Sequence, residues 1–315
     1  MIGLRALGAL ALAIAGCAGP QRVEEPPPRP ADDDLVGLLP SGADAVIDVD
    51  VAQLSAWPAA RRLLGDGAGG LAAKLGRHGF APLDDLDALA AALRGAGTDG
   101  AEATLLVRGR LDGARIERAL GGAAPVQFHG VRLLDGEDAS LALLTARAAV
   151  FGSPVEVRRA IDVLLGNDEG LRAGDADRVL REALGRAPAA KQGRPAVRAA
   201  WRPSPALLAQ LEGTHWPVEL VDWVAVAIAL GDGIDVGVVA GARDRARADE
   251  LQRRVELELA DLRAQPSLRA LGVADALGEV KLGRKPDELH LALRLDQAHF
   301  DRLAARLANL LSVAR

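Results

Sequence analysis

The chain has 315 residues, of which 50% are hydrophobic, 26% charged and only 3% aromatic, enough apolar material for one large core or two compact ones. Its 38 lysine and arginine residues against 43 acidic residues give a net charge of -5, which argues against a nucleic-acid-binding role. A single cysteine and no tyrosine exclude a disulfide framework, a cysteine-rich metal site and tyrosine-based chemistry.

The first 16 residues have the order of an export signal. Arg5 supplies a positive charge, residues 6–14 form an apolar stretch, and Ala15-Gly16 are small residues of the kind found at a cleavage site. The apolar stretch is much shorter than the roughly 20 residues that a membrane-spanning helix needs. We therefore predict that residues 1–16 are a signal peptide that is removed.

The sequence Ile14-Ala15-Gly16-Cys17 resembles the lipobox of bacterial lipoproteins. This resemblance implies that fatty acyl chains are attached at Cys17 and that Cys17 becomes the first residue of the mature chain. Several acyl chains would hold the protein stably on a membrane. By analogy with enterobacterial sorting, Ala18 in place of Asp favours the outer membrane, with the body in the periplasm. The alternatives are an ordinary secretory signal that contains a cysteine and a buried N-terminal helix.

Residues 17–34 are predicted to be a tether. They are rich in proline and acidic residues and lack apolar periodicity, which favours an extended chain without a core. The run Asp32-Asp33-Asp34 is expected to be solvated. A calcium loop would need a glycine turn and a distal glutamate at the correct spacing, and neither follows.

Residues 35–170 are predicted to form the first of two α+β subdomains. Alternating apolar residues predict a strand over 45–51. Short helices are expected over 55–64, with Ser55 as the cap, and over 83–93. Downstream, the patterns predict strands at 103–110, 126–134, 141–145 and 148–152, and a helix at 114–120.

The most clearly specified helix begins after residue 152. Ser153-Pro154-Val155-Glu156 has a capping residue, a proline at the first helical position and a glutamate three residues after the cap, which is the capping-box arrangement. Val157, Ile161 and Leu164 then share one face, and Gly166 is a natural stop. The boundary between the subdomains is predicted near residues 166–174.

Residues 171–315 are predicted to form the second subdomain, in which hairpins again alternate with helices. The expected elements are a strand at 197–201, a hairpin of 223–230 with 234–240, a helix bearing Leu251, Val255, Leu259 and Leu262, a hairpin of 280–282 with 289–295, and a last helix bearing Phe300, Leu303, Leu307 and Leu310. We predict an α+β fold with antiparallel sheets covered on one face by helices, in two similar tandem halves that each combine hairpins with helices.

The reactive residues of the sequence form no convergent set. Asp48 and Asp50 share a strand face, where a paired carboxylate could do acid–base work, but a solvated surface is favoured because no histidine, lysine or partner motif is close in the sequence. Gly152-Ser153-Pro154 resembles a nucleophile turn, but Ser153 is better explained as a helix cap. The remaining candidates are three glycines at dinucleotide-binding spacing and five separated histidines: Gly65, Gly67, Gly70, His78, His129, His215, His290 and His299. We predict no catalytic, cofactor or metal site.

Three segments carry a family resemblance. Leu106-Val107-Arg108-Gly109-Arg110-Leu111-Asp112, Val150-Phe151-Gly152-Ser153-Pro154 and Val157-Arg158-Arg159-Ala160-Ile161-Asp162 resemble uncharacterised lipoproteins of myxobacterial and related GC-rich genomes, over residues 40–170. The resemblance implies an envelope lipoprotein and implies no activity.

The sequence therefore predicts a lipid-anchored envelope protein that is not an enzyme and that binds an envelope protein or acts as a scaffold. The first alternative is a periplasmic carrier that holds an apolar ligand between sheet and helices. The second is a hydrolase, which would need an acidic residue and a histidine to meet in one cleft.

Overall fold

The fold is given by a computed structural model, which describes residues 34–58, 61, 82–112, 125–136, 139–171, 177–186, 194–211, 217–303 and 305. The chain divides into two compact units, the first ending at Arg178 and the second beginning at Val179. Cys17, the predicted helix 114–120 and the last two apolar positions of the final helix, Leu307 and Leu310, lie outside the described residues.

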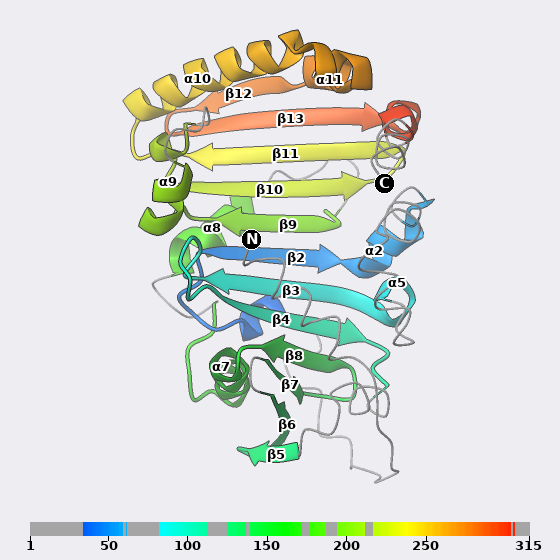
Figure 1. The fold of residues 1–315 in the computed structure, drawn as a ribbon, viewed down its shortest axis with the longest axis vertical. Coiled ribbons are helices and arrows are strands. Elements are labelled where there is room, and N and C mark those ends of the chain that lie inside the picture. Colours follow the sequence, from blue (N-terminus) through cyan, green and yellow to red (C-terminus); the bar gives the residue numbers. More distant parts are fainter. Residues whose placement is uncertain are drawn as a thin grey trace. The chain divides into compact units, whose positions relative to one another are not determined.

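The first unit is built on antiparallel strands that pair in the order β2-β3-β4-β8-β7-β6-β5 (Figure 1). Their bounds are β2 (Ala45–Asp50), β3 (Leu86–Arg94), β4 (Glu102–Gly109), β5 (Pro125–Phe128), β6 (Val131–Asp135), β7 (Ser140–Leu143) and β8 (Ala148–Gly152). The described helices of this unit are the 3₁₀-helix η2 (Val36–Leu38) and the α-helices α2 (Val51–Ala56), α5 (Pro82–Asp85) and α7 (Pro154–Leu165).

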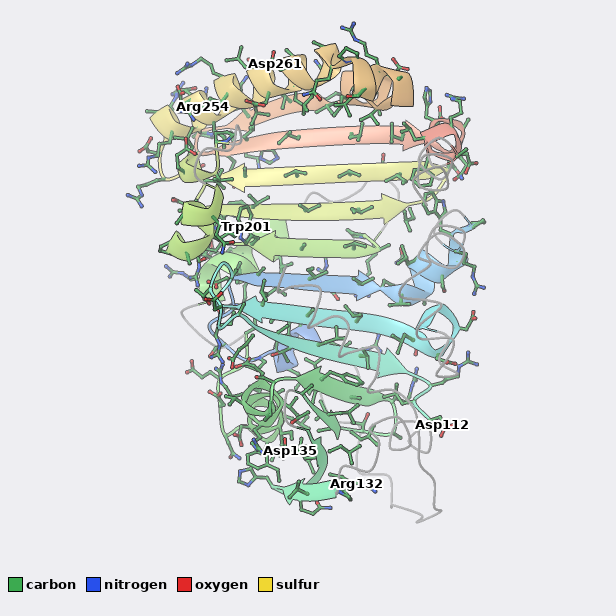
Figure 2. All side chains as sticks on the ribbon, in the orientation of Figure 1. Asp112, Arg132, Asp135, Trp201, Arg254 and Asp261 are labelled. Atoms are coloured by element: carbon green, nitrogen blue, oxygen red, sulfur yellow. The ribbon has the colours of Figure 1, made fainter. Side chains whose placement is uncertain are left out.

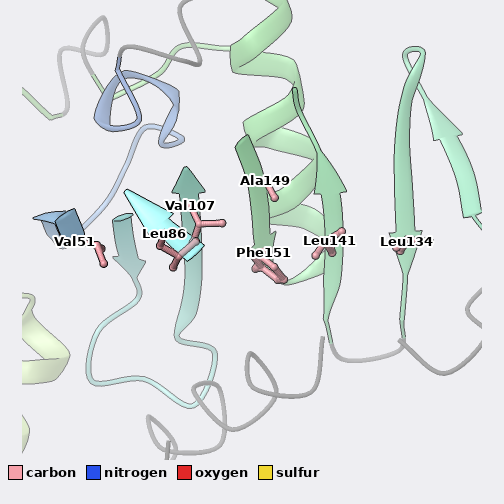
Figure 3. Packing of buried hydrophobic residues seen from close by; sticks show 7 residues of the cluster. All are labelled: Val51, Leu86, Val107, Leu134, Leu141, Ala149 and Phe151. Carbon is pink, nitrogen blue, oxygen red and sulfur yellow. The ribbon is translucent and has the colours of Figure 1, made fainter. Parts of the chain in front are cut away.

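One face of this sheet carries a hydrophobic cluster. Alternate residues of neighbouring strands meet there because paired residues of antiparallel strands point to the same side. Figure 3 shows its seven buried members: Val51, Leu86, Val107, Leu134, Leu141, Ala149 and Phe151. The cluster gathers side chains from α2 and from β3, β4, β6, β7 and β8, so it stabilises elements that lie far apart in the sequence.

Helix α7 forms as its sequence predicts. Ser153 has extended backbone angles and its Oγ accepts a hydrogen bond from the backbone N–H of Glu156 at 3.3 Å, while Pro154 occupies the first turn. The helix ends at Gly166, whose φ of 77° is left-handed and favours glycine. Val157 and Ile161 are fully buried, so the predicted apolar face packs inward.

The helix expected over 83–93 is wrong. Only Pro82–Asp85 is helical, and Leu86–Arg94 forms the strand β3 between β2 and β4. The segment is rich in alanine, which favours helices when isolated. Here its leucines and alanines alternate across two apolar sheet faces, and burial on both sides outweighs the local preference.

The single strand expected over 126–134 is two strands. β5 and β6 form a hairpin in which Phe128 pairs with Val131. The turn residues His129 and Gly130 both have positive φ, 50° and 81°, which the tightest two-residue hairpin turn requires. The predicted pairing of this region with the segment after residue 138 is confirmed, since Leu134 of β6 lies opposite Leu141 of β7.

The second unit contains five described strands paired antiparallel in the order β12-β13-β11-β10-β9 (Figure 1). They are β9 (Val197–Trp201), β10 (Trp223–Leu230), β11 (Gly233–Gly241), β12 (Lys281–Lys285) and β13 (Glu288–Asp296). The described helices are α8 (Arg178–Arg186), α9 (Pro205–Leu211), η5 (Val218–Leu220), α10 (Arg245–Ala264), α11 (Pro266–Leu271) and α12 (Val273–Gly278), and residues 297–303 are also helical.

The core of this unit forms where α10 packs on the sheet. Leu251, Val255 and Leu259 of α10 cluster with Ala240 and Leu289 of the strands, as the apolar spacing of the helix predicts. Arg254, labelled in Figure 2, lies beside this apolar side and donates to Glu219 at 2.7 Å, whereas Leu257 is 65% exposed. A helix with one apolar side is typical of helices that cover a sheet face and shield it from solvent.

The predicted fold class is confirmed: both units are α+β with antiparallel sheets. The chain divides eight residues beyond the predicted end of the first subdomain at residue 170. Gly170 forms an isolated β-bridge with Pro40, and the N–H of Leu171 donates a hydrogen bond to the carbonyl of Leu39 at 2.7 Å. These contacts attach residues 170 and 171 to the first unit. The similarity of the two halves stays a prediction. In the described part of the chain, no helix is long and apolar enough to cross a membrane.

Candidate functional site

The residue that the sequence singles out most strongly, Cys17, lies outside the described residues, as do Asp32, Asp33, the glycines at 65, 67 and 70, His78 and His215. Its acylation therefore stays a prediction. The described chain begins with Asp34, whose Oδ1 accepts a hydrogen bond from the N–H of Gly37 at 3.2 Å. This last residue of the predicted acidic tether thus binds the backbone of the first turn of the body.

Asp48 and Asp50 lie on one face of β2, but Asp50 serves the local fold. Its Oδ1 accepts from the backbone N–H of Gln53 at 2.9 Å, and its Oδ2 accepts from the Gln53 amide at 3.1 Å. Asp50 is therefore the cap of α2. The assignment of Ser55 as cap is wrong, because the helix starts four residues earlier at Val51 and already contains it.

The three described histidines each lie beside a different carboxylate. His129 is 3.5 Å from Asp162, and His299 is 3.0 Å from Asp296. His290 Nε2 lies 2.8 Å from Glu288 Oε2. No group of three or more potential metal ligands gathers in the described part of the chain.

The first unit contains a buried carboxylate whose surroundings the sequence does not predict. Glu156 has a side chain that is 5% exposed, and it accepts hydrogen bonds from Arg94, from Arg159 at 3.3 Å and from Thr104 Oγ1 at 3.0 Å. The capping box predicts instead that this carboxylate turns back to the backbone of Ser153. Its partners connect α7 to β3 and β4, so the group stabilises the fold.

The second unit contains a comparable cluster around Glu288, at the start of β13. Its side chain is 7% exposed. Arg186 of α8 approaches Oε1 to 2.9 Å, while Lys285 and His290 approach Oε2 to 3.4 and 2.8 Å. Both oxygens of this buried carboxylate are therefore occupied by cationic or imidazole donors.

Trp223 packs against the arginine of this cluster. The Arg186 guanidinium lies 5.5 Å from the centre of the Trp223 ring, within the range of a cation–π contact. Trp223 in turn covers Gly241 on the neighbouring strand, where an added Cβ would come within 2.1 Å of the ring. The sequence shows that Trp223 lies on a strand, but it does not show that a distant arginine stacks on it.

Acid is expected to weaken this cluster. Burial acts to raise the pKa of Glu288, but the hydrogen bond from His290 and the charges of Lys285 and Arg186 outweigh it and hold the pKa below its ordinary value of 4.5. The stabilisation is therefore complete above the unfolded-state pKa and is lost as the pH falls through the lower folded-state pKa. Thermal unfolding measured from neutral to acidic pH should show a shallower acid loss for Glu288→Gln. Parallel curves for the two proteins would contradict this assignment.

An exposed apolar patch lies on the first unit. Ile47 of β2 and Leu93 of β3 are 43% and 37% exposed. They share one sheet face, because Ile47 pairs with Ala91 and Leu93 pairs with Ala45. Adjacent exposed aliphatic residues on a sheet face are a feature of surfaces that bind a protein or an apolar ligand.

Comparison with known proteins supports the fold alone. No family model and no curated protein matches the chain. Two crystal structures of the protein TP0453 are similar at 13% identity, crystal form III with a TM-score of 0.53 and crystal form IV with 0.51. Each match covers 89% of this chain, and they cover 99% and 96% of the TP0453 chains. The chain therefore shares its overall α+β architecture with TP0453.

Proposed function

We propose that the protein is a lipid-anchored lipoprotein of the bacterial envelope whose folded body binds another envelope protein or acts as a scaffold. The observation that carries the proposal is the sequence Ile14-Ala15-Gly16-Cys17, in which the only cysteine of the chain follows an apolar stretch and two small residues. The resemblance of residues 40–170 to uncharacterised myxobacterial lipoproteins agrees with it.

The proposed arrangement has a membrane end and an aqueous end. Acyl chains on Cys17 insert into the membrane, and two or more such chains make the attachment stable. Residues 18–34 connect this anchor to the body, and their proline content favours an extended spacer. The outer membrane, facing the periplasm, is the proposed location because Ala18 follows the cysteine.

The binding role is supported by the apolar patch formed by Ile47 and Leu93. A patch of this kind suits a partner that buries it. The carboxylates of Asp50 and Glu156, by contrast, are engaged in capping and in ion pairs. The proposal therefore assigns the body a binding role and names no reaction.

Replacement of Cys17 tests the anchor. We expect the wild-type protein, expressed in a bacterial host, to incorporate labelled palmitate, to fractionate with membranes and to begin at residue 17. Cys17→Ser should incorporate no label and should not be cut before residue 17, because serine lacks the thiol that is acylated. Gly19→Ser, a matched change two residues away, should behave as wild type. An unmodified amino terminus, or a start at another residue, refutes the proposal.

A further inference from the structure

The outer strand of the second unit carries an unusual concentration of lysine. Only four lysines occur in the chain, and two of them, Lys281 and Lys285, lie on β12. They are four positions apart, so their side chains point to the same face, about 13 Å apart along the strand. Both residues are exposed. Lys281 forms no ion pair with the residues that the structure describes.

A histidine lies between these lysines on the neighbouring strand. Gly283 is directly opposite His290 in the register of β12 and β13, while Lys281 is opposite Ala292 and Lys285 is opposite Glu288. A Cβ on Gly283 would be 3.7 Å from the Cβ of His290, an ordinary contact. Glycine thus leaves open the space above the strand between the two lysines, with the imidazole at its side.

The buried carboxylate orients this imidazole. Glu288 Oε2 only accepts hydrogen bonds when ionised, so His290 Nε2 carries the proton and donates to it at 2.8 Å. Since Arg186 and Lys285 also surround Glu288, its charge is neutralised within the cluster. Lys285 approaches Glu288 at 3.4 Å, which leaves two of its three N–H groups for another acceptor.

We propose that Lys281 and Lys285 form a binding site for a phosphate group above Gly283, beside the ring of His290. A phosphate presents three or four oxygens in a tetrahedral arrangement, which suits donors that converge from different sides, and lysine binds it as a point charge. Acidic residues also flank β12, Glu279 before it and Asp287 after it, so the site accepts one anionic group and not an extended polyanion. The phosphate belongs either to a free anion or to a lipid headgroup.

Titration of the purified protein with inorganic phosphate tests the site. We expect the imidazole resonances of His290 to shift in a saturable manner as the anion binds beside the ring. Sodium chloride at equal ionic strength should not reproduce the shift, because general screening does not require the convergent donors. Lys281→Gln should weaken binding about tenfold, the effect of one charge-assisted hydrogen bond. Lys281 has no contact with Glu288, so this variant leaves the buried cluster intact.

Further variants separate the site from general charge effects. Lys285→Arg should retain binding, and Gly283→Ala, whose Cβ would lie 3.7 Å from the Cβ of His290 in an ordinary contact, should weaken it by occupying part of the space. Arg245→Gln, which removes an exposed cation from the start of α10, should bind as wild type. A short-chain phosphatidylglycerol below its micelle concentration identifies the source: a response to it alone assigns the site to a headgroup, and a response to phosphate assigns it to the free anion.

Two results would overturn the proposal. One is the absence of a His290 response to either compound. The other is an unchanged response in Lys281→Gln combined with Lys285→Gln. If that double variant self-associates while its phosphate response is unchanged, the lysines act instead to prevent pairing at the exposed strand, a common use of lysine on edge strands.

Discussion

Replacing Glu156 with alanine is expected to lower the free energy of unfolding of the first unit by about 3 kcal/mol. Removal of this carboxylate, which is 5% exposed, leaves Arg94 and Arg159 without the acceptor that they share. The loss lies at the lower end of the range for a broken buried ion pair, because the two arginines are partly exposed and retain Glu102 and Asp168 as partners. Urea denaturation followed through hydrogen exchange of the α7 amides measures the change.

Two further variants define the cause of that loss. Glu156→Gln keeps an oxygen for Thr104 but removes the charge, so it should destabilise the unit less than alanine does. Val155→Ala changes the preceding residue of α7, which is 54% exposed, and should alter stability by no more than about 0.5 kcal/mol. Equal losses for Val155→Ala and Glu156→Ala would show that the carboxylate does not hold the unit together.

The sequence predicts α7 well because its signals are local. Ser153, Pro154 and Gly166 act on backbone groups within a few residues of themselves, and each lies where the pattern places it. The role of Glu156 is different. Its partners Thr104 and Arg94 are 52 and 62 residues away, so nothing near Glu156 in the sequence distinguishes a buried ion pair from a capping box.

The strand β3 shows a second limit of prediction from the sequence. Its alanines and leucines satisfy a helical pattern as well as a strand pattern, and only pairing with β2 and β4 decides between them. The hairpin of β10 and β11 is predicted correctly, because alternation on both sides of Gly231-Asp232-Gly233 specifies the turn and its flanking strands together.

The cluster around Glu288 depends on one contact that is local in the sequence and on one that is distant. Its contact with His290 follows from two residues that alternate on one strand, which a sequence can reveal. Its contact with Arg186 joins residues 102 positions apart. In the sequence His290 is only one of five separated histidines, because the buried carboxylate beside it depends on the packing of α8.

Gly241→Val is expected to destabilise the second unit by about 3 kcal/mol, at the upper end of the effects of overpacking. Any Cβ at this position would lie 2.1 Å from Cε2 and 2.2 Å from Nε1 of Trp223, a separation that the rigid indole cannot accommodate without moving. Displacement of the ring removes the cation–π contact with Arg186 and disturbs the donation from Arg186 to Glu288. Urea unfolding and tryptophan fluorescence together measure the loss of stability and the movement of the ring.

A double-mutant cycle establishes whether the clash with Trp223 is the cause. Gly241→Ala should be clearly destabilising in the wild-type protein and nearly neutral in a Trp223→Ala background, because the obstructing ring is then absent. Gly278→Ala is the matched control, since an added Cβ there meets nothing within 4 Å, and it should change stability by no more than about 0.5 kcal/mol. If Gly241→Ala costs the same in both backgrounds, the glycine serves the backbone of β11, and the stack of Gly241, Trp223 and Arg186 does not support the cluster around Glu288.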